Sequence, residues 1–157
     1  MAKAIKLIIS VLACLLAGFV GSAATMPSIP TWYASLQKPA FNPPNWIFAP
    51  VWTTLFIMMG VAAFLVWDKG LENKKVRISL AIFCLQLLLN VLWSVLFFGM
   101  HSPLYAFIDI MMLWASILAT IIYFHRISAA AAYLLIPYIL WVSFASALNL
   151  FIVILNR

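Results

Sequence analysis

Uncharged polar side chains recur at helical spacing inside one of the apolar runs of this chain. Gln86, Asn90 and Ser94 follow one another at intervals of four residues, so a helix places them on one face. Amide and hydroxyl groups inside a membrane helix either tie it to its neighbours by hydrogen bonds or line a partly polar cavity. The two interpretations are about equally good for Gln86 and Ser94. For Asn90, with Trp93 beside it, we favour the cavity and expect the amide to supply a hydrogen-bond donor.

A second polar face is predicted near the C-terminus, where Trp141, Ala145 and Asn149 repeat the same spacing. A deep indole gains little from lipid unless its N–H finds a partner, so Trp141 is expected to face a cavity or another helix. Asp109 is the one acid inside an apolar run. It is either a proton site or a hydrogen-bonding tie between helices, and we favour the tie.

The familiar patterns of soluble enzymes are missing from this sequence. No Ser-His-Asp, Cys-His or phosphate-loop arrangement appears, so we name no catalytic residue. No metal site is expected either, because the predicted topology places His101 and His125 on opposite sides of a membrane. A binding protein is therefore favoured over an enzyme.

The composition predicts that these residues sit in a bundle of membrane-spanning helices. Of the 157 residues, 68% are hydrophobic and 8% are charged, whereas a soluble domain carries about 25% charged residues. The apolar runs are continuous rather than alternating, which favours helices over a barrel. A span needs about twenty apolar residues. Five runs qualify within a single domain of residues 1–157: about 5–24, 46–67, 78–99, 103–124 and 129–155.

The first run has an alternative interpretation. Lys3 and Lys6, an apolar stretch and then Gly21–Ala24 resemble a secretory signal peptide with a cleavage site. The apolar stretch is long for a signal, and small residues recur in it every four positions, as in a helix that packs closely. We therefore favour a retained first span.

The basic residues predict how the helices are oriented. With five spans, seven lysines and arginines share the side of the N-terminus, and Lys38 and Arg157 lie on the other side. Cytoplasmic loops carry the excess of basic residues, so we expect a cytoplasmic N-terminus, with the first loop and the C-terminus outside. The net charge of +6 reflects this asymmetry, and we expect no nucleic-acid partner.

The stretch Thr25–Trp52 contains the longest connection, of about twenty residues, and five of the eight prolines fall between Pro27 and Pro44. Proline cannot donate a backbone hydrogen bond and disfavours the helix before it. Long loops in compact chains are usually functional or disordered, and the aromatic residues Trp32, Tyr33, Phe41 and Trp46 argue against disorder. We expect an ordered lid on one end of the bundle. By contrast, Pro137 falls inside the fifth run, where it predicts a kink.

These motifs resemble one known family. Trp32-Tyr33, then Leu36, then Lys38-Pro39-Ala40-Phe41-Asn42-Pro43-Pro44 and Trp52 are similar to the first loop and second helix of the TspO/MBR family. That family comprises tryptophan-rich sensory proteins and translocator proteins, also called peripheral-type benzodiazepine receptors. Asn90-x-x-Trp93-Ser94, Asp109 and Pro137–Trp141 resemble its third, fourth and fifth helices.

The resemblance implies a five-helix bundle, a homodimer and a pocket beneath the first loop that binds porphyrins such as protoporphyrin IX, with no cofactor required. Positions that match the family's pocket are Tyr33, Pro43, Phe48, Trp52, Asn90, Trp93, Trp141 and Ala145. Light- and oxygen-dependent porphyrin degradation and porphyrin or lipid transport remain alternative functions. The family's cholesterol motif needs a tyrosine that the stretch Leu148–Arg157 lacks.

Overall fold

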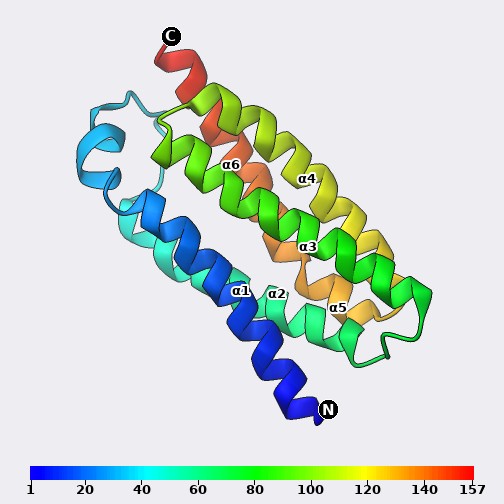
Figure 1. Ribbon diagram of the computed structural model, residues 1–157. Helices are drawn as coiled ribbons and strands as arrows, with labels where there is room; N and C mark the ends of the chain where they lie inside the picture. The colour runs from blue at the N-terminus through cyan, green and yellow to red at the C-terminus, as the bar shows by residue number, and fades with distance from the viewer.

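A computed structural model describes residues 1–157 as an all-helical chain (Figure 1). Five helical segments are long and apolar enough to cross a membrane: Lys3–Thr25, Asn45–Trp67, Lys74–Gly99, Pro103–His125 and Ala129–Leu155. The elements are α1 (Lys3–Thr25), a π-helical turn (Ile29–Tyr33), a 3-10 turn (Asn45–Ile47), α2 (Phe48–Trp67), α3 (Lys74–Ser94) continued by a π-helical turn (Val95–Gly99), α4 (Pro103–His125), α5 (Ala129–Leu134) and α6 (Ile136–Leu155). The predicted fold class of five spanning helices is confirmed.

The fifth span is broken into α5 and α6 as proline requires. Pro137 lies in the first turn of α6, where its missing N–H costs nothing. The turn just before Pro137 is tighter than an α-helical turn, because the Leu135 N–H donates to the carbonyl of Ala132, three residues earlier, at 3.1 Å. The kink predicted from Pro137 is therefore confirmed.

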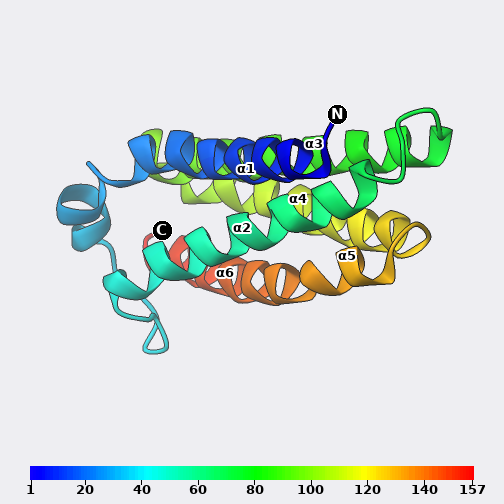
Figure 2. The ribbon, with the colours of Figure 1, turned by 90° about the horizontal axis from the view of Figure 1, so that it is seen from below.

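The helices form an elongated bundle, with the first loop and the C-terminus at one end and the N-terminus and the α2–α3 loop at the other (Figures 1 and 2). We call the end with the N-terminus the closed end. α2 packs mainly against α1 and also contacts α5 and α3, α1 contacts α3 as well, and α4 packs on α3, α5 and α6. Buried side chains such as Met59, Val66, Ile117 and Phe124 fill the closed end. Nearer the first loop, a cavity is left between the helices.

The closed end is tied by two ion pairs between the start of α1 and the residue that follows α2. Asp68, just after α2, lies 3.3 Å from both Lys3 and Lys6. Desolvation favours the neutral acid, but the hydrogen bonds and charges of the two lysines prevail and hold the pKa of Asp68 below its ordinary value. These contacts keep the start of α1 beside the end of α2.

At the opposite end, which we call the loop end, the first loop is fastened to two other segments. Ser28 Oγ donates to the carbonyl of Phe98 at 2.6 Å, and the Trp32 ring stacks on His101 with centroids 4.5 Å apart. The Asn156 side chain forms two hydrogen bonds with the backbone of Gln37, at 3.0 and 2.9 Å. The proline-rich segment is thus an ordered cap joined to the α3–α4 turn and to the C-terminus.

Candidate binding pocket

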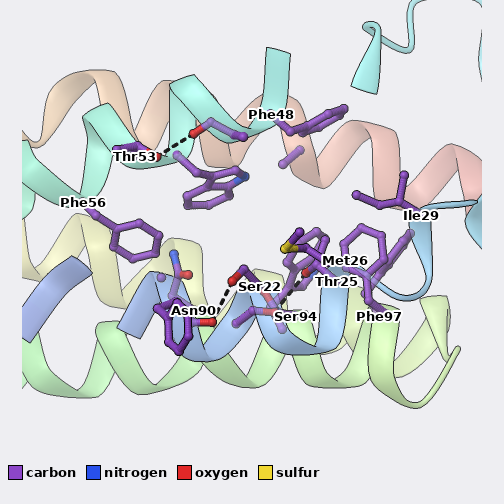
Figure 3. Close-up of a pocket in the computed structure, with 18 of the residues that line it drawn as sticks. Ser22, Thr25, Met26, Ile29, Phe48, Thr53, Phe56, Asn90, Ser94 and Phe97 are labelled. Carbon is purple, nitrogen blue, oxygen red and sulfur yellow. Dashed lines mark hydrogen bonds between the residues drawn. The ribbon is translucent and has the colours of Figure 1, made fainter. Parts of the chain in front are cut away.

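A cavity of about 540 Å³ lies at the loop end, between α1, α2, α3 and α6 and beneath the first loop (Figure 3). This volume falls within the range of small-molecule sites, roughly 300–1,000 Å³. Most of the lining side chains are apolar and none is charged. The site is therefore suited to a molecule that presents a mostly apolar, uncharged surface.

Tyr33 closes the cavity from above. Its side chain is 5% exposed and its ring lies 5.6 Å from the ring of Phe98. Burial raises the pKa of Tyr33, and the hydrogen bond from its hydroxyl to Asn42 Oδ1, at 3.2 Å, only partly offsets this effect. Lys38 Nζ lies over the Tyr33 ring, 4.6 Å from its centroid. The phenol therefore stays neutral and held within the cap.

Aromatic rings from two helices form the walls. On α2, the Trp52 and Phe56 rings are 5.7 Å apart and inclined by 31°. Near the end of α3, Trp93 stacks on Phe97 with centroids 5.2 Å apart and planes 23° apart. Such rings offer broad faces to a flat apolar molecule, for which offset stacking is favourable.

A chain of buried hydrogen bonds fixes Asn90 in the wall. Its Nδ2 donates to Tyr138 Oη at 2.7 Å, and that hydroxyl donates to Gln86 Oε1 at 2.7 Å. The Asn90 donor that the sequence led us to expect for a ligand is therefore partly engaged by the protein. Asn90 Oδ1 has no hydrogen bond to the protein, so this residue offers the cavity an acceptor.

Two other polar atoms of the lining residues are similarly unpaired. Trp52 Nε1 and Ser94 Oγ have no hydrogen bond to the protein, although both residues line the cavity. The indole of Trp93 differs, because its Nε1 donates to Asn149 Oδ1 at 3.0 Å. Asn149 Nδ2 in turn donates to the carbonyl of Pro103 at 2.8 Å. Trp52, Asn90 and Ser94 thus supply a donor, an acceptor and a hydroxyl, all uncharged.

The structure brings together most of the residues predicted for the pocket. Tyr33, Phe48, Trp52, Asn90, Trp93 and Ala145 line the cavity. Pro43 and Trp141 do not line it. Trp141 lies behind Phe48, with ring centroids 5.9 Å apart, and its buried Nε1 has no partner.

The wall contributed by α1 was not predicted. Gly18, Ser22 and Thr25 line the cavity from this helix and are spaced by four and three residues, so they share a face. This spacing of small and hydroxyl residues was a usable signal. It was obscured by the small-residue face of Ala13, Ala17 and Gly21, which is typical of helix packing, although Ala17 and Gly21 also line the cavity.

The expectation that Asp109 ties two helices by a hydrogen bond is wrong. Asp109 is 1% exposed, and neither carboxylate oxygen has a hydrogen-bond partner. It does not line the cavity. No three potential metal-ligating side chains among His, Cys, Asp and Glu gather anywhere in the structure.

Comparison with known proteins gives a consistent result. Residues 10–155 match the model of the TspO/MBR family. The chain is 48% identical to the tryptophan-rich protein TspO of Chlorobaculum tepidum, over 91% of this chain and 90% of that one. It is 46% identical to the TspO protein of Archaeoglobus fulgidus over 97% of both chains, and 38% identical to the human translocator protein over 83% of this chain and 78% of that one. The chain therefore belongs to the TspO/MBR family.

Proposed function

We propose that this membrane protein is a receptor or sensor that binds a porphyrin, such as protoporphyrin IX, in the cavity beneath the first loop. The observation that carries the proposal is the cavity itself: an uncharged space of about 540 Å³ walled by the rings of Trp52, Phe56, Trp93 and Phe97. A porphyrin has a wide apolar face that stacks on such rings.

The unpaired polar atoms add selectivity to this apolar slot. A ligand that hydrogen-bonds to Trp52 Nε1, Asn90 Oδ1 or Ser94 Oγ binds with a more favourable free energy than a ligand that leaves these groups without partners. The carboxylates of a porphyrin have no cation inside the cavity, so they belong outside it, near the headgroups. Lys38, which reaches only to Leu36 O and the Tyr33 ring, is a cation in the cap at that level.

The test is a titration of the purified protein with protoporphyrin IX, followed by the absorbance of the porphyrin itself. Trp52→Leu removes a wall and a donor, and we expect affinity to fall about tenfold or more, since an aromatic pair and a hydrogen bond are together worth about 1–3 kcal/mol. Trp46→Leu is the matched control, because Trp46 is 74% exposed and does not line the cavity. Equal affinities of the two variants would contradict the assignment of the site.

A further inference from the structure

The cap leaves little room for a ligand to enter from the water at the loop end. It is held by Ser28 on Phe98, by the stacked Trp32 and His101 rings, and by the paired hydrogen bonds between Gln37 and Asn156. The buried Tyr33 lies beneath these attachments. Passage through the cap would break several of these contacts together.

The side of the cavity between α1 and α2 is different. Nearer the closed end, α1 and α2 touch backbone to backbone, because a Cβ added to Gly60 would lie 2.5 Å from Val11 Cα. Nearer the loop end, the Phe56 ring of α2 packs against Gly18 of α1, and a Cβ added to Gly18 would lie 2.6 Å from this ring. At Gly21, the next glycine of α1 toward the loop, an added Cβ would meet Ser94 Oγ of α3 at 3.1 Å and no atom of α2 within 4 Å.

Between the Gly18–Phe56 contact and the loop end, several residues that line the cavity are also exposed on the outside of the bundle. They are Phe19, which is 71% exposed, and Met26, which is 69% exposed, on α1, with Ala49 and Thr53 on α2. Figure 3 shows Phe48, Thr53 and Phe56 of α2 on one side of the cavity and Ser22, Thr25 and Met26 of α1 on the other. The cavity therefore reaches the outer surface through this gap.

The depth of the gap places it against lipid. Phe19 lies six residues before the end of α1, which is about 9 Å along the helix axis. Both flanking helices belong to the predicted membrane spans. A ligand that crosses this opening comes from the bilayer rather than from water.

The chemistry of the rim suits contact with hydrocarbon. The hydroxyls of Ser22, Thr25 and Thr53 donate to carbonyls of their own helices at 2.7, 3.0 and 2.8 Å, so they need no water. Phe19 and Met26 are apolar, and methionine in particular adapts its shape easily. No charged residue lines the opening.

We propose that the gap rimmed by Phe19, Ser22, Met26, Ala49 and Thr53 is a lateral portal through which the cavity exchanges its ligand with the membrane. The inference rests on the proposed function and narrows the ligand class. The ligand is dissolved in the bilayer, its apolar and uncharged part slides between α1 and α2, and any carboxylate stays at headgroup level.

The test compares two cross-links in the protein reconstituted into vesicles, in a Cys84→Ser background. One pair, Ser22→Cys with Thr53→Cys, is bridged across the portal by a short bifunctional maleimide. The other pair, Gln37→Cys with Asn156→Cys, is bridged across the cap. The probe is protoporphyrin IX dimethyl ester, loaded in the lipid of the same vesicles, and its binding and release are followed by absorbance.

We expect the portal cross-link to slow both association and release by about tenfold or more, because a blocked route slows both directions. The cap cross-link should leave both rates within about twofold of the uncross-linked protein. Slowing by the cap cross-link alone, or equal slowing by both, would overturn the portal.

A single substitution serves as a second test that needs no cross-link. Ala49→Trp narrows the rim and should slow both rates, whereas Ala23→Trp, on an exposed position of α1 outside the cavity lining, should not. Equal rates for these two variants would count against the portal. Absence of any saturable binding before modification would instead refute the proposed function.

Discussion

At the scale of single residues, Tyr138 joins polar groups of α3 to α6. It is 1% exposed, accepts a hydrogen bond from Asn90 and donates one to Gln86. Tyr138→Phe keeps the ring but leaves Asn90 Nδ2 without a partner and Gln86 Oε1 without its donor. An unpaired buried polar group costs about 1–3 kcal/mol, and membrane cases lie toward the lower end.

We therefore expect Tyr138→Phe to lower the free energy of unfolding by about 1–3 kcal/mol, measured by titration with a denaturing detergent. Tyr105→Phe is the matched control, because Tyr105 is 61% exposed and its hydroxyl makes no hydrogen bond. A loss of stability that is the same in both variants would show that the hydrogen-bond chain contributes nothing.

Asp109 is a residue whose removal should help the fold. Its two oxygens are buried without partners, and a buried polar group without a hydrogen bond is unfavourable. Asp109→Leu has a similar shape, so we expect the free energy of unfolding to rise by about 1 kcal/mol. The same detergent titration measures it, and marked destabilisation would mean that the carboxylate has an essential partner.

Much of the site could be predicted at the residue scale because helical spacing is a local property. The face of Gln86, Asn90 and Ser94 follows from the sequence, as does the position of Trp93. What could not be predicted is how each helix is rotated against its neighbour. Tyr138 lies 48 residues from Asn90, so their hydrogen bond depends on packing, and so does the displacement of Trp141 behind Phe48.

At the scale of elements, α1 depends on its attachment to α2 at the closed end. Lys3 and Lys6 hold Asp68, and these contacts lower the pKa of Asp68 in the folded protein. Their contribution is present above the ordinary pKa of 3.8 and is lost as the pH falls through the lower pKa of the folded state. The stabilisation therefore disappears only in strong acid.

The lowered pKa of Asp68 predicts that removing its carboxylate changes the free energy of unfolding by an amount that depends on pH. Asp68→Asn should be less stable than the unaltered protein at pH 7, and the difference should vanish once the pH is below the folded pKa. Detergent denaturation at a series of pH values measures it, with Glu72→Gln in the same exposed loop as control, because Glu72 has no ion pair. A difference that persists in strong acid would exclude the ion pair as its source.

The elements themselves were predictable to different degrees. The five spans differ from their predicted ends by at most four residues, because apolar length is a strong signal. The proline-rich segment was expected as an ordered lid, but its π-helical turn Ile29–Tyr33 was not. That turn depends on contacts far along the chain, such as Ser28 with Phe98, which local sequence does not reveal.

At the scale of the whole molecule, the two ends of the bundle differ in charge and in role. The closed end carries Lys3, Lys6, Lys69, Lys74, Lys75, Arg77 and Arg126, and the loop end carries Lys38 and Arg157. The cap and the cavity lie at the end with few basic residues. Because positive loops stay in the cytoplasm, the cap and the upper edge of the portal are expected on the outer side.

Labelling with a membrane-impermeant maleimide in whole cells tests this orientation. In a Cys84→Ser background, Ser35→Cys in the exposed part of the cap should react before the cells are opened. Glu72→Cys, exposed in the α2–α3 loop, should react only afterwards. The reverse pattern would place the cap in the cytoplasm, and the ligand would then reach the portal from the inner leaflet, since the α1–α2 gap opens near the capped end of the bundle.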